Sequence, residues 1–94
     1  MKKYVKNKTV ASQKVDEKEL VLLHPKAENF FSLNTTAAFI WDMLEKPRTE
    51  EEIIAALANR YSGSGDSMKN DARNILKILI KWSLVDTIDG KTNR

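Results

Sequence analysis

The spacing of apolar residues changes once along this chain, at Asn34. Before Asn34 the apolar residues form short runs separated by polar turn segments, a pattern typical of β-strands. The runs predict three short antiparallel strands over residues 9–15, 20–23 and 28–33. The second run reads Leu-Val-Leu-Leu without a polar residue, so we expect that strand to be covered on both faces.

After Asn34 the apolar residues recur at the spacing of an α-helix. The side chain of Asn34 or Thr35 can cap the first helix by accepting a hydrogen bond from a free backbone N–H. Thr49 and Glu52 have the spacing of a capping box, which predicts the start of a second helix. The predicted helices span about residues 35–45, 50–61 and 67–83, and a last strand covers residues 84–88.

These elements predict an α+β fold, in which a three-stranded antiparallel N-terminal sheet precedes a three-helix winged helix-turn-helix-like domain. We expect the domain over residues 9–88, with a flexible N-terminus at 1–8 and a flexible C-terminus at 89–94. Trp41 and Trp82 are expected to anchor its single core. The chain has no cysteine, which excludes disulfides and thiolate metal sites. It also lacks an apolar signal-peptide region and any apolar run of transmembrane length, so we expect a cytoplasmic protein without membrane contact.

The net charge of +3 is distributed unevenly along the chain. Residues 1–26 carry a net charge of +4, residues 27–66 carry −4 and residues 67–94 carry +3. A basic surface can meet nucleic acid or an acidic peptide, although most basic side chains at this net charge are simply solvated. Charge alone therefore leaves the class of partner open.

The third predicted helix carries two apolar surfaces when its residues are placed about 100° apart around the helix axis. Between its core face and a basic ridge lies a second apolar strip, formed by Leu76 and Ile80. The strip either covers an edge of the sheet or forms one wall of a groove for an extended peptide. The core face comprises Met68, Ala72, Ile75, Leu79 and Trp82, and the ridge comprises Lys69, Arg73, Lys77 and Lys81.

The strand at 28–33 would form the other wall of such a groove. It contains neither proline nor lysine, which commonly block an edge strand, so a peptide could pair with its free main-chain groups. Phe30 and Phe31 point to opposite faces, one towards the core and one towards the groove, and the sequence leaves open which is which. The candidate peptide-binding residues of the two walls are Glu28, Asn29, Phe30, Phe31, Ser32, Lys69, Ala72, Arg73, Leu76, Lys77 and Ile80.

The run Leu-Asn-Thr-Thr-Ala from Leu33 to Ala37, followed by Ile-Trp at residues 40–41, resembles the start of the first helix in the PqqD-like family. The resemblance covers roughly residues 19–86. It implies a domain that recognises ribosomally made precursor peptides and holds their leader segment between the third strand and the third helix. It also implies a partner enzyme, either a radical-SAM enzyme of quinone-cofactor or related pathways or a leader peptidase and cyclase of lasso-peptide pathways.

Two alternatives of other classes remain on the sequence alone. The basic ridge could serve a winged-helix DNA-binding transcriptional regulator, although the acidic middle of the chain and the short wing after Gly90 argue against DNA. The chain could also be a structural subunit of a larger enzyme. An enzymatic site is not expected, because His24 is the only histidine and is predicted to be an exposed turn residue. We predict no catalytic residue, no metal site and no cofactor.

Overall fold

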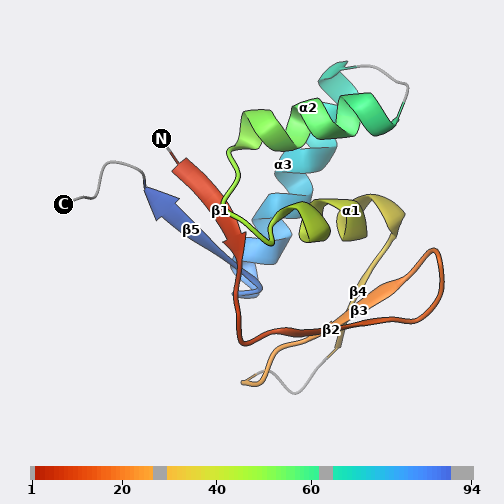
Figure 1. Ribbon diagram of the computed structural model, residues 1–94, viewed down its shortest axis with the longest axis vertical. Coiled ribbons are helices and arrows are strands. Elements are labelled where there is room, and N and C mark those ends of the chain that lie inside the picture. Colours follow the sequence, from red (N-terminus) through yellow and green to blue (C-terminus); the bar gives the residue numbers. More distant parts are fainter. Residues whose placement is uncertain (1, 27–29, 62–64, 90–94) are drawn as a thin grey trace.

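Two small antiparallel sheets flank three helices in this protein, as the computed structural model in Figure 1 shows. The structure describes residues 2–26, 30–61 and 65–89. The predicted α+β class, the three-stranded antiparallel sheet and the three helices are confirmed. In chain order the elements are β1 (Lys2–Lys6), β2 (Ala11–Lys14), β3 (Leu20–Leu23), β4 (Phe30–Leu33), α1 (Thr35–Met43), α2 (Glu50–Arg60), α3 (Gly65–Lys81) and β5 (Val85–Asp89).

The larger sheet has the strand order β2-β3-β4, so β4 forms one of its edges. Leu22 of β3 pairs with Phe31 of β4, and both side chains lie on the inner face, which packs against the helices. Phe30 points to the opposite, outer face and is 72% exposed. Phe31 is therefore the residue that faces the core, whereas Phe30 lies on the face that is turned away from the helices. The expectation that residues 20–23 are covered on both faces is wrong, because Leu23 is exposed on the outer face.

The second sheet pairs β1 with β5 and was missed by the sequence analysis, which expected residues 1–8 to be flexible. Tyr4 ties β1 to the rest of the domain, because its ring is buried and its backbone exchanges two hydrogen bonds with Arg48. The N···O distances are 2.7 Å and 2.9 Å. A lysine-rich strand of this kind gives little local signal, since its partners are more than forty residues away in sequence. Asp89 ends β5, and residues 90–94 lie outside the described residues.

Local capping signals fix the starts of the first two helices. The Asn34 side chain accepts a hydrogen bond from the Ala37 N–H at 2.9 Å, which confirms it as the cap of α1. At α2 the Glu52 N–H donates to Thr49 Oγ1 at 3.1 Å, and the Thr49 N–H donates back to Glu52 Oε1 at 2.8 Å. The predicted capping box is therefore present. The hydrogen bond from the Thr49 backbone lowers the pKa of Glu52.

Helix α3 begins at Gly65 and ends at Lys81, two residues before the predicted end. Ser83 adopts the left-handed backbone conformation with φ of 59°. The N–H groups of Leu84 and Ser83 donate to the carbonyls of Leu79 and Ile80, which is the Schellman arrangement that closes a helix. This turn directs the chain into β5.

The core lies between the helices and the inner face of the larger sheet. Trp41 is fully buried, as predicted, whereas Trp82 is exposed, so its assignment to the core was wrong. His24 is buried and its Nδ1 accepts a hydrogen bond from the Lys26 N–H at 3.0 Å, which corrects the prediction of an exposed turn residue. None of the described helices combines the length and the apolar character needed to cross a membrane. The largest fully buried side chains are Trp41, Leu22, Ile40, Leu44, Ile53, Leu57, Leu79 and Leu84.

Candidate functional site

The free edge of β4 runs beside helix α3. At one end the ring of Phe31 packs on the ring of Trp82, with centroids 5.4 Å apart and planes at 45°. At the other end a cavity of about 280 Å³ separates the start of α1 from the middle of α3. Its lining residues are Asn34, Thr36, Asp71, Asn74 and Ile75. The chain from Phe31 to Asn34 therefore runs antiparallel to α3, and the cavity lies at the Asn34 end.

The two walls of this space have matching lengths. From Phe31 to Asn34 an extended chain covers about 10 Å, and from Ile75 to Trp82 a helix rises by about 10 Å. A segment of about three or four extended residues would span the same distance. We call the surface between these two segments the β4–α3 groove, and define it by Phe31, Asn34, Ile75, Ile78 and Trp82.

The wall that α3 contributes is mainly apolar. Ile75 lines the cavity, Trp82 contacts Phe31, and Ile78 lies between them at spacings of three and four residues. Ile78 is 55% exposed although it is a large apolar residue. Asp71 and Asn74 add polar groups at the cavity end. The groove thus offers apolar contacts near Trp82 and hydrogen-bonding or cation-binding groups near Asn34.

The basic ridge of α3 lies on another flank of the helix. Arg73 Nε donates to Glu50 Oε2 of α2 at 3.1 Å, so this flank faces α2. Arg73 and Ile75 are two residues apart, which places them about 200° apart around the helix. The other members of that flank follow by helical spacing and are Lys69, Lys77 and Ile80. Lys81, the last member of the ridge, lies over the ring of Trp82 with 5.6 Å between its Nζ and the ring centroid, so one basic side chain of the ridge borders the groove at that end.

The remaining candidates on α3 belong to the core. Ala72 is completely buried and Leu76 is only 3% exposed. The core face of the helix is centred on these two residues and Leu79, rather than on the predicted sector that ended at Trp82. The error arose because a helical wheel gives relative directions only, and the positions of β4 and α2 decide which sector is inward.

The candidates on the strand divide between the two faces of β4. Phe31 lies on the inner face, where its ring packs on the ring of Trp82. Phe30 and Ser32 point outwards, and the hydroxyl of Ser32 is hydrogen-bonded to the Glu19 carboxylate on that outer face. Glu28 and Asn29 lie outside the described residues. Ile78 and Asn74 of this surface were not among the candidates, because an isolated isoleucine or asparagine on the solvent side of a wheel carries no distinctive signal. Asn34, Asp71, Ile75 and Trp82 were not among them either, and the sequence had assigned Asn34 to a helix cap and Ile75 and Trp82 to the core.

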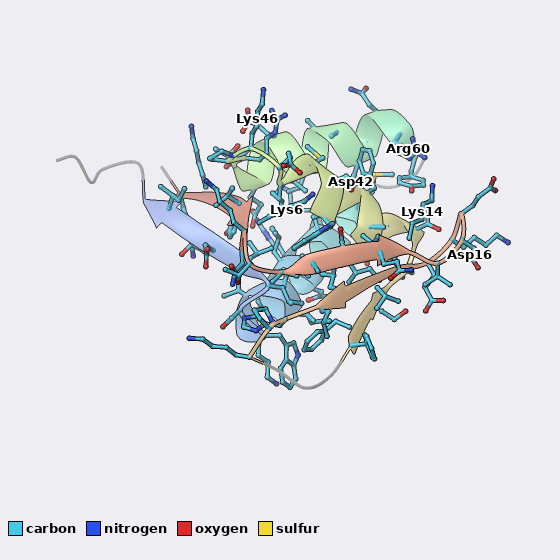
Figure 2. All side chains as sticks on the ribbon, turned by 60° about the horizontal axis from the view of Figure 1, so that its bottom comes forward. Lys6, Lys14, Asp16, Asp42, Lys46 and Arg60 are labelled. Carbon is cyan, nitrogen blue, oxygen red and sulfur yellow. The ribbon has the colours of Figure 1, made fainter. Side chains whose placement is uncertain are left out.

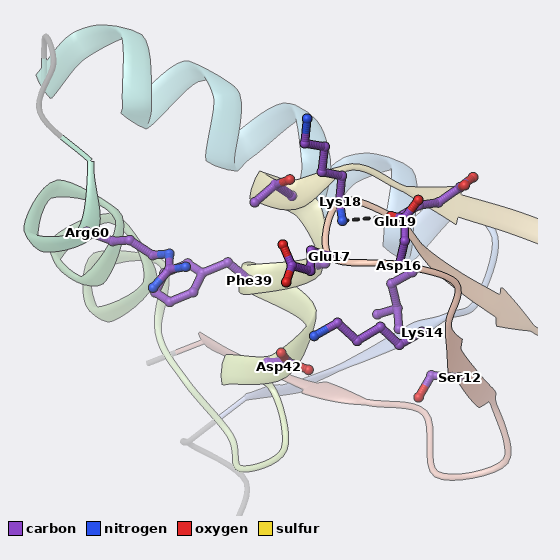
Figure 3. A pocket seen from close by; sticks show the side chains of 12 residues that line it. Ser12, Lys14, Asp16, Glu17, Lys18, Glu19, Phe39, Asp42 and Arg60 are labelled. Atoms are coloured by element: carbon purple, nitrogen blue, oxygen red, sulfur yellow. Dashed lines mark hydrogen bonds between the residues drawn. The ribbon is translucent and has the colours of Figure 1, made fainter.

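A second cavity, of about 450 Å³, lies between the β2–β3 turn and helices α1 and α2 (Figure 3). Lys14, Glu17 and Asp42 extend into its opening, and Arg60 lies over the ring of Phe39 with 5.1 Å between the guanidinium carbon and the ring centroid. Its wall mixes basic and acidic side chains, and the acidic ones (Asp16, Glu17, Glu19 and Asp42) outnumber the basic ones (Lys14, Lys18 and Arg60) by one. Within the described ranges, no three His, Asp or Glu side chains gather closely enough to hold a metal ion.

Solved structures with the same fold include two small leader-peptide complexes. The structure described as TbiB1 in complex with the TbiA(beta) leader peptide is 29% identical, covers 95% of this chain and 99% of that one, and has a TM-score of 0.76. Lasso peptide synthetase B1 complexed with the leader peptide is 18% identical over 88% of this chain and 96% of that one, with a TM-score of 0.75. The heterocyclase TruD matches at 13% identity and a TM-score of 0.67, over 99% of this chain and 12% of its own.

Comparison with curated proteins gives no match. A family profile does match, and it is described as coenzyme PQQ synthesis protein D (PqqD). The match covers residues 19–85, which include β3, β4, all three helices and the first residue of β5. Since this is most of the chain, the protein belongs to the PqqD family.

Proposed function

We propose that this protein binds the leader segment of a ribosomally synthesised precursor peptide and presents it to a separate modifying enzyme, without catalysing a reaction itself. The observation that carries the proposal is the free edge of β4 beside the apolar flank of α3. Membership of the PqqD family supports it, as does the likeness to TbiB1, which was solved with a leader peptide. Holding the peptide raises its effective concentration at the enzyme, so no chemistry is required of this chain.

In this proposal the leader adds to β4 as a further strand of the sheet. Main-chain hydrogen bonds to the β4 edge give general affinity, and alternate side chains of the peptide give specificity. Those that point inwards enter the β4–α3 groove, where Phe31, Ile75, Ile78 and Trp82 offer apolar contacts. A peptide with two or three spaced apolar residues fits this wall, with a polar or basic residue near Asp71 and Asn74.

Several finer features belong to the same proposal. The three helices with the antiparallel β1–β5 pair form a winged helix-turn-helix-like unit, and the protein works in the cytoplasm. The partner enzyme is either a leader peptidase and cyclase or a radical-SAM enzyme. The likeness to lasso peptide synthetase B1 supports the first, and the PqqD family name supports the second.

Two isoleucines of α3 provide a matched test of the site. Ile78 lies on the groove flank and is 55% exposed, whereas Ile80 lies about 200° away on the other flank and is 36% exposed. The assay is isothermal titration calorimetry with the synthetic leader of the precursor encoded beside this gene. We expect Ile78→Ser to weaken binding about tenfold, since one buried aliphatic side chain is worth about 1.5–3 kcal/mol. Ile80→Ser should bind like the wild type.

The outcome separates the two flanks of α3. A loss of leader affinity confined to Ile80→Ser, or to Lys77→Glu beside it, would place the binding site on the flank with the basic ridge. Tight, sequence-selective binding of duplex DNA with no leader binding would replace the proposal by the DNA-binding alternative. The affinity for DNA bound through the basic ridge would fall steeply as the salt concentration rises, because phosphate contacts release counterions.

A further inference from the structure

Strand β2 is the second free edge of the larger sheet, and the proposed function leaves it without a role. The strand order is β2-β3-β4, and among the described residues only β3 pairs with β2. Its sequence is Ala-Ser-Gln-Lys, and all four residues are exposed. It contains one lysine, Lys14, and no proline, which are the two residues that commonly block an edge strand. The main-chain groups of this edge are therefore open to pairing with another extended chain.

The register of the β2–β3 hairpin shows which main-chain groups of β2 face outwards. The N–H of Val15 donates to the carbonyl of Glu19 at 3.0 Å, and these two residues continue the register of the hairpin. Residues along an antiparallel pair alternate between hydrogen-bonded and non-hydrogen-bonded positions. Gln13 therefore directs its N–H and carbonyl at β3, whereas Ser12 and Lys14 direct theirs at the free edge. An extended peptide beside β2 would pair with these two residues.

Open space lies between β2 and helix α1. The cavity of about 450 Å³ described above is lined by Ser12 and Lys14 of β2 and by Asp42 of α1. A further cavity of about 380 Å³ lies next to it, since Ser12 lines both. The lining of the further cavity includes Lys6, Lys8, Val10, Trp41 and Glu45. We call the two cavities together the β2–α1 groove.

The two ends of the β2–α1 groove carry a small excess of opposite charge. At the end near β1, Lys6 and Lys8 meet a single carboxylate, that of Glu45, whose Oε1 lies 2.8 Å from Lys6 Nζ. At the hairpin end the acidic side chains outnumber the basic ones by one. Asp42 extends into this opening, and none of the ion pairs among the described residues involves it. In Figure 2, which has β2 in front, Lys6 lies to one side of this face, Lys14 to the other and Asp42 between them.

We propose that the β2–α1 groove is a second peptide-binding site, which takes an extended segment of a partner protein as a strand added to β2. The segment pairs with the outward main-chain groups of Ser12 and Lys14, and its alternate side chains enter the groove. It carries an acidic residue for the end formed by Lys6 and Lys8, and a basic residue for the end formed by Asp42, because complementary charges fix the direction and register of a bound chain.

The length of the groove sets the spacing of the two charges. Val10 lines one end of the groove and Lys14 the other, and four residues of extended chain cover about 13 Å. Side chains that enter the groove recur at every second residue, so the acid and the base stand four positions apart. The leader proposed for β4 is a different ligand, since the β4–α3 groove is mainly apolar and selects spaced apolar residues. The two sites lie on opposite edges of the sheet, so the inference does not depend on leader binding.

A phage-displayed library of random eight-residue peptides, selected on the purified protein, is the probe for this site. Synthetic copies of the selected peptides are then titrated against the protein by calorimetry and by NMR of the backbone amides. Asp42→Lys reverses the charge of an exposed residue of the β2–α1 groove. The matched control is Asp71→Lys, because Asp71 is an exposed aspartate that lines the cavity beside α3 instead. Thermal melts show that both variants are folded.

We expect the selected peptides to carry an acid and a base four positions apart, and their binding to shift the amide signals of Ser12 and Lys14. Asp42→Lys should weaken their binding about fivefold or more, because the charge reversal replaces an ion pair by repulsion. A peptide in which glutamate replaces the basic residue should bind this variant more tightly than it binds the wild type. Asp71→Lys should leave the affinity of the selected peptides within about twofold of the wild type.

Three results would overturn the inference. They are the absence of any enriched peptide on the folded protein, selected peptides without this charge spacing, and binding that is weakened by Asp71→Lys but not by Asp42→Lys. The last result would assign the peptides to the β4–α3 groove. Failure of the leader to bind the wild-type protein is a different result, because it would remove the proposed function and leave this inference standing.

Discussion

Truncation of Leu76 tests whether the structure orients α3 correctly. Leu76→Ala removes three carbon atoms from a side chain that is 3% exposed. At about 0.8 kcal/mol for each buried CH₂ group, the transfer loss is about 2.4 kcal/mol. The cavity left beside Ala72 and Leu79 adds to this loss, and buried Leu→Ala changes cost about 2–5 kcal/mol in total. We therefore expect a loss of about 3 kcal/mol in the free energy of unfolding.

Urea denaturation followed by circular dichroism measures this loss. A domain of this size has a stability of roughly 5–14 kcal/mol, so the variant should remain folded in buffer, with a lower midpoint and an unchanged slope. The control is Ile78→Ala, which removes the same class of side chain from an exposed position on the same helix. Its cost should stay below about 1 kcal/mol.

The reasoning would be refuted by the reverse pattern. If Leu76→Ala cost less than about 1 kcal/mol while Ile78→Ala cost 2 kcal/mol or more, Ile78 rather than Leu76 would face the core. The sequence interpretation, with Leu76 on a groove wall, predicts a small stability loss and weaker leader binding. The structure predicts a large stability loss and, in the fraction that stays folded, leader binding close to that of the wild type.

Three further predictions concern local interactions. Thr49→Ala removes the cap of α2 and should lower stability by about 0.5–2 kcal/mol in urea denaturation, whereas Thr49→Ser should restore most of it. Ser83 has a left-handed backbone conformation that glycine adopts at lower cost. Ser83→Gly should therefore raise the free energy of unfolding by about 1 kcal/mol, and with it the melting temperature, while Ser83→Ala should raise neither. The lowered pKa of Glu52 means that its ionised form stabilises the fold above its usual value of 4.5, and that this contribution is lost as the pH falls through the lower folded-state pKa. Stability measured from pH 6 downwards should therefore fall less steeply in Glu52→Gln than in the wild type, and identical curves would contradict the hydrogen bond.

The sequence by itself determined the features that depend on neighbours along the chain. The Asn34 cap and the Thr49–Glu52 capping box join residues three positions apart, so their geometry follows from helix formation alone. The alternation of side chains along a strand is equally local, and it established that Phe30 and Phe31 point to opposite faces. The same local patterns were enough to predict the α+β class and the order of the strands and helices from β2 onwards.

Only the tertiary structure decided which of these surfaces meet one another. The contact of Phe31 with Trp82 joins residues fifty-one positions apart, and the pair of Arg73 with Glu50 turns the basic ridge towards α2. The strand β1 forms only because β5 and Arg48 lie beside it. Periodicity gives the direction of each side chain relative to its own helix or strand. The orientation of one element against another depends on how all of them bury their apolar surface together, so no single segment carries it.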